Sequence, residues 1–275
     1  MTTSLTGIDG DDIIRESIKK SGGSLRVLQV SPRVLGRYVK IASEGDESVE
    51  KIRVLSGENA LKEAMNDFLI ASAASDLIEE GKLELLTTED NSYRSLVVVG
   101  DSEIMSFVDV GERMGALSTD DAGMVEDASE FFEEMWEEGN EFSIRTPPAS
   151  RVVETLREEI GEETQEDFTS ILDILETAKG NGDGLDEITV ALLAAARNEV
   201  LLYDISKWGE DSGVASKATF SRKKTEMEDR GLIDTENVPI DIGRPRLRLK
   251  FADESLHDAP LEEVVETAKE AMQDS

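Results

Sequence analysis

The stretch SGVASKATFSRKKTEMEDRGLI, residues 212–233, decides how the C-terminal half of this chain is organised. Ser216 is suited to cap the start of a helix, and Gly231 is suited to end it. When Phe220 is placed at the centre of one helix face, Met227 falls on the same face, and small, polar and cationic residues fall on the opposite one. The stretch therefore predicts a helix with a buried apolar side and a cationic outer side.

The segments on either side of this helix complete a known order of elements. Apolar residues at helical spacing predict helices over 185–198 and 199–213, with Trp208 in the core, and strands are predicted on both sides of the turn GRP, residues 243–245. Three helices followed by a hairpin is the order of a winged helix-turn-helix, in which the third helix enters the major groove of DNA. The hairpin, or wing, contacts the DNA backbone or the minor groove.

The charge of this segment is opposite to that of the rest of the chain. The 275 residues include 61 Asp and Glu against 29 Lys and Arg, which is a formal net charge of −32. Between Ser216 and Lys250 there are nine Lys and Arg against six Asp and Glu, a local net charge of +3. We call residues 216–250 the cationic island. A cationic segment in so acidic a chain suits contact with the phosphates of DNA.

We expect the DNA contacts to come from the outer face of the third helix and from the wing. Arg222 is the best candidate for a base contact, because an arginine can bind guanine through two hydrogen bonds. A cluster of Lys and Arg can also be an ordinary solvated face, and a winged helix can bind another protein. An acidic protein-interaction module and an effector-binding protein without DNA binding are therefore the alternatives. The full set of DNA-binding candidates is Lys217, Thr219, Ser221, Arg222, Thr225, Arg244, Arg246 and Arg248.

The pattern of residues 1–145 predicts an α/β domain with a mostly parallel sheet and crossover helices. This domain precedes the C-terminal winged helix-turn-helix. Short apolar runs alternate with helical patterns, and this alternation is typical of parallel strands joined by helices. The predicted strands are 24–31, 50–57, 82–89, 94–100 and 103–110, the last two as a terminal hairpin, and the predicted helices are 11–20, 31–43, 58–81 and 119–139.

We divide the chain into four parts by the changes in its composition. An α/β sensing or assembly domain covers 1–145, and an acidic helical connector covers 146–184. The winged helix-turn-helix covers 185–252, and an amphipathic helix at 259–273 is expected to serve in a homodimer. Dimers would read palindromic sites about one DNA turn apart.

A small metabolite could bind the α/β domain, since parallel sheets hold ligands at the C-terminal ends of their strands. Arg33, Arg37 and Ser56 lie at these ends and could receive an anionic effector. The alternative is that these segments are ordinary loops and that the domain needs no ligand.

Catalytic, metal and cofactor sites find little support in the sequence. The only histidine is His257, and no G-x-S-x-G motif exists to accompany it in a catalytic triad. The loop KGNGDGLDEITV has Lys179 and Val190 where a calcium loop requires acids. The chain has no cysteine, which excludes zinc fingers and disulfides. We therefore expect no enzyme activity, no metal and no cofactor.

The sequence also predicts where the protein works. No apolar run approaches the roughly 18–20 residues that a membrane span needs, and the N-terminus has no signal-peptide pattern, so we expect a cytoplasmic protein without membrane contact. The acidity is spread along the whole chain. Such a charge destabilises a compact protein unless ions screen it, which favours a halophilic origin and a salt-rich cytoplasm.

The segment DISKWGEDSGVASKATFSRKKTEMEDRGLIDTE, residues 204–236, resembles an archaeal winged-helix pattern. The matching residues are Lys217, Thr219, Ser221, Arg222, Asp229, Gly231, Leu232 and Ile233. Over nearly its full length the chain resembles the haloarchaeal TbsP-type transcriptional regulators, and it is more distantly similar to the TrmB-like sugar-responsive regulators, which place the DNA-binding domain first. The resemblance implies transcription control in a halophilic archaeon, with genes of central sugar metabolism as targets.

Overall fold

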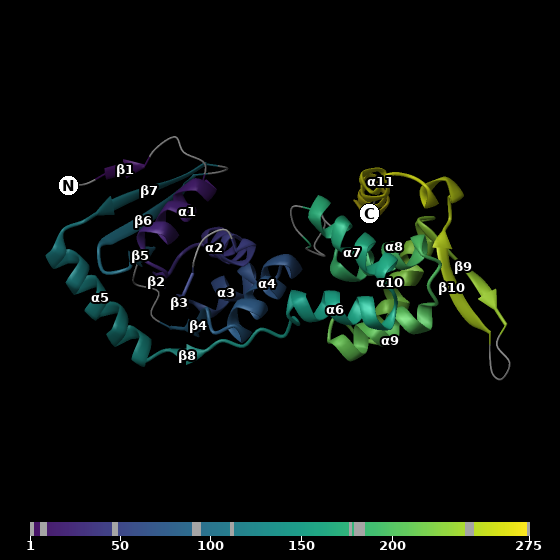
Figure 1. The fold of residues 1–275 in the computed structure, drawn as a ribbon, viewed down its shortest axis with the longest axis horizontal. Helices are drawn as coiled ribbons and strands as arrows, with labels where there is room; N and C mark the ends of the chain where they lie inside the picture. The colour runs from purple at the N-terminus through teal and green to yellow at the C-terminus, as the bar shows by residue number, and fades with distance from the viewer. Residues whose placement is uncertain are drawn as a thin grey trace. The chain divides into compact units, whose positions relative to one another are not determined.

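The computed structural model describes residues 3–5, 10–45, 49–89, 95–110, 113–175, 178, 185–239 and 245–273. The chain divides into two compact units, one made of residues 1–66 and 70–145 and the other of residues 67–69 and 146–275 (Figure 1). Each unit has its own apolar core.

The first unit is built on a mixed sheet in the order β1-β7-β6-β5-β2-β3-β4-β8. The predicted α/β class is confirmed, and β2, β3 and β4 pair in parallel as expected. The hairpin β5–β6 forms as predicted, but β5 also pairs with β2, so the hairpin lies inside the sheet. The remaining pairs are antiparallel, and β1, β7 and β8 were not predicted. The strands are β1 (Thr3–Leu5), β2 (Ser24–Leu28), β3 (Lys51–Ser56), β4 (Leu83–Thr87), β5 (Leu96–Val99), β6 (Glu103–Val110), β7 (Arg113–Thr119) and β8 (Asn140–Glu141).

The helices of this unit match the predicted ones with one difference. The predicted helix 58–81 is two helices, because the chain turns after Ala64 and the Asp67 carboxylate accepts a hydrogen bond from the Leu69 backbone N–H at 3.1 Å, which caps the second helix. The helices are α1 (Gly10–Lys20), α2 (Pro32–Glu44), α3 (Glu58–Ala64), α4 (Phe68–Glu79) and α5 (Ala122–Glu137).

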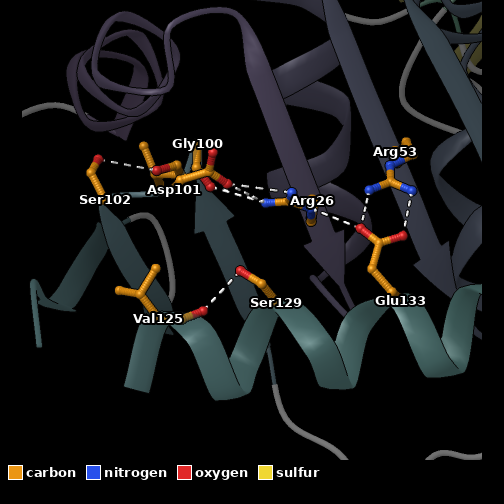
Figure 2. Close-up of polar contacts among 9 residues, drawn as sticks. Arg26, Arg53, Gly100, Asp101, Ser102, Val125, Ser129 and Glu133 are labelled. Atoms are coloured by element: carbon orange, nitrogen blue, oxygen red, sulfur yellow. Dashed lines mark hydrogen bonds and ion pairs between the residues drawn. The ribbon is translucent and has the colours of Figure 1, made fainter. Parts of the chain in front are cut away.

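Helix α5 covers the second face of the sheet through a small apolar cluster and an ion-pair network. Phe132 of α5 packs with Leu28 and Leu55, which point away from the larger core. On the same face Glu133 binds both Arg26 of β2, at 3.1 Å from Nε, and Arg53 of β3, at 2.8 Å from Nη1 (Figure 2). Arg53, and more weakly Arg26, lower the pKa of Glu133. One carboxylate therefore ties the helix to two neighbouring strands.

The second unit is helical, with one hairpin. Its central helix is α8, which is buried from Ile188 to Ala196. The wing strands β9 and β10 pair antiparallel, and a bridge between Leu201 and Arg248 adds the segment before α9 to them. The elements are α6 (Ala149–Glu159), α7 (Glu162–Ile174), α8 (Glu187–Arg197), α9 (Leu202–Ser212), α10 (Lys217–Asp229), β9 (Ile233–Val238), β10 (Arg246–Phe251), the 3-10 turn η1 (Glu254–His257) and α11 (Leu261–Gln273).

The two acidic helices α6 and α7 share the core of the winged helix-turn-helix. Leu156 of α6 and Phe168 of α7 are buried in the same cluster as Trp208 of α9. The Trp208 indole N–H donates to the Thr155 hydroxyl at 3.0 Å, and its ring meets Phe168 edge to face at 6.1 Å between centroids. The acidic segment that the sequence suggested as a connector thus packs as part of the second unit.

No helix in the described parts of the chain is long and apolar enough to cross a membrane.

Candidate nucleic-acid interface

Helix α10 is formed and positioned by signals in its own sequence. Ser216 caps it by accepting a hydrogen bond from the Thr219 backbone N–H at 3.2 Å. Gly213 before it and Gly231 after it have left-handed backbones, with φ of 86° and 69°. These observations confirm the start and end that the sequence predicted. They place α10 directly after α9 with the short turn that a helix-turn-helix requires.

The inner face of α10 is apolar, as predicted. Phe220 and Met227 are fully buried. The Phe220 ring lies directly against Gly209 of α9, where an added Cβ would be only 2.1 Å from Cε2 of the ring. The two helices therefore approach as closely as they do because residue 209 has no side chain.

The outer face of α10 brings together the small and polar residues that the sequence placed there. Ser221, Arg222 and Thr225 are exposed. Together with Ala218, Glu226 and Asp229 they line a shallow hollow along the helix surface. The Thr225 hydroxyl donates to the Ser221 carbonyl at 3.1 Å, and the Thr219 hydroxyl lies 2.9 Å from that of Ser216. Thr219 therefore belongs to the helix cap.

Most cations of the island that the structure describes are already paired with acids of the same unit. On α10, Lys223 binds Asp186 at 3.0 Å and Lys224 binds Glu228 at 2.6 Å. Both of these lysines are largely buried. Among the described island cations Arg222 alone has no such partner. Its guanidinium is thus free to bind an external acceptor.

Three further cations, at the start of α10 and on β10, are also paired, but these pairs are exposed. Lys217 binds Glu210 of α9 at 2.7 Å, and this hydrogen bond lowers the pKa of Glu210 and raises that of Lys217. On β10, Arg246 binds Asp204 at 3.4 Å, and Arg248 binds Glu199 at 3.5 Å.

Arg246 has a second partner, Tyr203. The guanidinium lies 4.3 Å from the centre of the tyrosine ring, a cation–π contact on an exposed side chain. Arg244, the other predicted wing arginine, lies outside the described residues.

Tyr203 and the carboxylates of Glu199, Asp204 and Glu210 were not predicted from the sequence. Their partners lie far along the chain, so no local pattern connects them. The sequence holds one weak signal for Tyr203. Aromatic residues make up only 5% of the chain, and this one comes directly after Leu201 and Leu202.

The three effector candidates of the first unit do not form one cluster by any contact that the structure describes. Arg37 binds Asp11 at 3.1 Å, and its guanidinium lies against Gly10. Ser56 is buried, with its hydroxyl 3.5 Å from the Gln29 side-chain carbonyl. Arg33 is exposed on the first turn of α2.

A hollow beside α5 is instead acidic, with Asp101, Asp120, Glu126 and Glu130 among its lining residues.

One carboxyl group of the second unit titrates near neutral pH. Burial at the start of α8 raises the pKa of Glu187 to about 7, with a smaller contribution from its neighbour Asp186.

Within the described residues, no three acidic or histidine side chains are grouped so that they could hold a metal ion.

Comparison with known families accounts for both units. Residues 2–147 match the family described as "Transcriptional regulator TbsP-like, N-terminal", and residues 148–269 match "Transcriptional regulator TbsP-like, C-terminal HTH domain". This chain belongs to the TbsP-like transcriptional regulators. Its family therefore agrees with the helix-turn-helix geometry of α9 and α10 and with the resemblance noted in the sequence. No curated protein sequence matches the chain.

Solved structures show weaker similarities to this TbsP-like regulator. TrmBL2, an archaeal chromatin protein, is 18% identical with a TM-score of 0.37, over 51% of this chain and 54% of that chain. The regulator thus spans about half the length of that structure. NUC of Salmonella typhimurium, a phospholipase D family member, is 11% identical with a TM-score of 0.38, over 52% and 97%. NucT of Helicobacter pylori is 11% identical with a TM-score of 0.36, over 52% and 99%.

Proposed function

We propose that this TbsP-like regulator binds double-stranded promoter DNA with the outer face of α10 in the major groove and the β9–β10 wing on the flanking backbone. The observation that carries the proposal is Arg222, which is exposed at the centre of the outer face and has no acidic partner among the described residues. An unpaired guanidinium can bind a guanine edge through two hydrogen bonds without first losing another partner. It is therefore the residue that we assign to base recognition.

The residues around Arg222 are assigned to the DNA backbone. Ser221 and Thr225 lie beside it in the same hollow, and their hydroxyl groups can donate hydrogen bonds to phosphate oxygens. Lys217 at the start of α10 and the wing arginines Arg246 and Arg248 are exposed and would neutralise phosphates.

We further propose how the regulator is used in its host. It acts in a salt-rich cytoplasm of a halophilic archaeon, as a homodimer that reads palindromic sites about one DNA turn apart. Helix α11 supplies part of the dimer contact, and the first unit senses a small effector or assists assembly. The family resemblance suggests genes of central sugar metabolism as targets.

The test is chromatin immunoprecipitation of the tagged protein and of an Arg222→Ala variant in the host. We expect sharp promoter peaks for the wild type and their loss in the variant, because the alanine removes the base contact. Arg157→Ala is the matched control, since Arg157 is an exposed arginine on α6, outside the proposed interface. Flat profiles for all three proteins would refute DNA recognition and would favour a protein partner for the winged helix.

A further inference from the structure

Three exposed cations of the island, one at the start of α10 and two on β10, share one kind of partner. Each is bound by a carboxylate from the short segment between Glu199 and Glu210. The pairs are Lys217 with Glu210, Arg246 with Asp204, and Arg248 with Glu199, at 2.7, 3.4 and 3.5 Å. The cations come from two separate elements, α10 and β10. The acids all come from α9 and the turn before it, and we call Glu199, Asp204 and Glu210 the three masking carboxylates.

Helix α9 and the turn before it pack against both cationic elements, α10 and β10. The bridge between Leu201 and Arg248, and the hydrogen bond from the Leu249 N–H to the Val200 carbonyl at 3.0 Å, fix the segment of Glu199 beside β10. Tyr203 of α9 stacks on Arg246, and Glu210 of the same helix binds Lys217. Helix α9 therefore contacts both the wing and the start of α10.

Folding stability does not account for the masking carboxylates. All three side chains are between 41% and 56% exposed, and exposed ion pairs contribute little to the stability of a fold. Their main effect is therefore on the charge of the protein surface. They cancel the positive charge on the face where DNA is proposed to bind, except at Arg222.

We propose that the three masking carboxylates tune DNA binding, and this inference rests on the proposed function. When DNA binds, each of the three paired cations exchanges its carboxylate for a phosphate. The released carboxylate stays close to the negatively charged DNA, which weakens non-specific attraction. Arg222 needs no such exchange, so base recognition contributes a larger share of the affinity.

The exchange has a consequence for salt dependence. A free lysine or arginine that neutralises a phosphate releases a condensed counterion, and each such contact contributes about −0.9 to the slope of log K against log salt concentration. A masked cation releases the same counterion, but its former carboxylate takes up a cation from solution. The two effects nearly cancel, so masked contacts keep their strength as the salt concentration rises.

The experiment compares the full-length wild type with a triple variant, Glu199→Gln, Asp204→Asn and Glu210→Gln. The probe is a fluorescent DNA duplex that the wild type selects from a random-sequence pool. Affinity is measured over the range of KCl concentrations in which circular dichroism shows all variants to be equally folded. We expect the triple variant to bind at least about tenfold more tightly at the lowest salt, with a slope steeper by up to about 0.9 for each neutralised carboxylate.

The matched control is Glu154→Gln, Glu158→Gln and Glu166→Gln at exposed positions of α6 and α7, outside the proposed interface, which changes the net charge by the same amount. This control is expected to keep the wild-type slope. A triple variant whose affinity and slope equal those of the wild type or of the control would overturn the inference while DNA binding stands. If the wild type selects no duplex at all, the proposed function fails and the inference fails with it.

Discussion

At the scale of the residue, Glu187 couples the stability of the second unit to pH. Its folded pKa of about 7 lies above the ordinary value of 4.5, because burial disfavours the charged form. Asp186 and Asp67 add to this effect, and Lys223 opposes it. The folded state therefore binds more protons than the unfolded state between these two values. The contribution of Glu187 to the free energy of unfolding is therefore largest below about pH 4.5, and it falls as pH rises towards 7.

The substitution Glu187→Gln removes this partly buried carboxyl group. We expect the variant to be more stable than the wild type at pH 8 by about 2 kcal/mol, and equally stable near pH 4.5, where the folded glutamate is protonated. Denaturant unfolding at the two pH values measures the difference. Glu266→Gln, at an exposed position of α11, should show no such dependence on pH. A Glu187→Gln protein that is no more stable than the wild type at pH 8 would contradict the assignment.

At the scale of the element, the contact between α9 and α10 depends on Gly209. Its replacement by alanine would place a methyl group 2.1 Å from the Phe220 ring, so that the two helices would have to move apart. We expect Gly209→Ala to destabilise the second unit by about 1–3 kcal/mol, as overpacked cores do. The midpoint of thermal unfolding measures this cost.

Gly36→Ala on α2 is the matched control. Its new methyl group would meet Ile70 no closer than 3.7 Å, which is ordinary contact. Because alanine favours helix, this variant is expected to gain up to about 1 kcal/mol. If the two substitutions changed the unfolding midpoint equally, the close approach of Phe220 would not be what prevents a side chain at residue 209.

The acidic helices α6 and α7 support the winged helix through their packing. Phe168 is fully buried against Trp208, so Phe168→Ala leaves a cavity in the core of the second unit. We expect a loss of about 3–5 kcal/mol and a weaker near-ultraviolet circular dichroism signal from Trp208. A loss below about 1 kcal/mol would mean that residues 146–184 act only as a connector.

At the scale of the whole molecule, the net charge of −32 makes stability depend on salt. Like charges repel across the folded surface, and the Debye length falls from about 10 Å at 0.1 M salt to about 3 Å at 1 M. We expect the unfolding temperature to rise steadily from about 0.1 to about 2 M KCl, since screening relieves this repulsion. Sucrose at matched water activity serves as the uncharged control. An unfolding temperature that does not respond to KCl would contradict a halophilic adaptation.

Local signals in the sequence predict the helices and the hairpin of the winged helix-turn-helix and the face that α10 turns outward. The Ser216 cap, the glycine stops at Gly213 and Gly231, and the spacing of Phe220 and Met227 act within a few residues, so the sequence shows them directly. The parallel strands β2, β3 and β4 were predicted for the same reason, because each is a short apolar run beside its helix.

Which charges remain available, and how the sheet is completed, depend instead on contacts between segments that are far apart in the chain. Arg246 and Asp204 are 42 positions apart, and β1 pairs with β7 across more than 100 residues. Periodicity carries no information about such pairs, because their energy arises only when distant segments meet in space. For the same reason the sequence shows nine cations in the island but not that Arg222, among those described, is the one without an acidic partner.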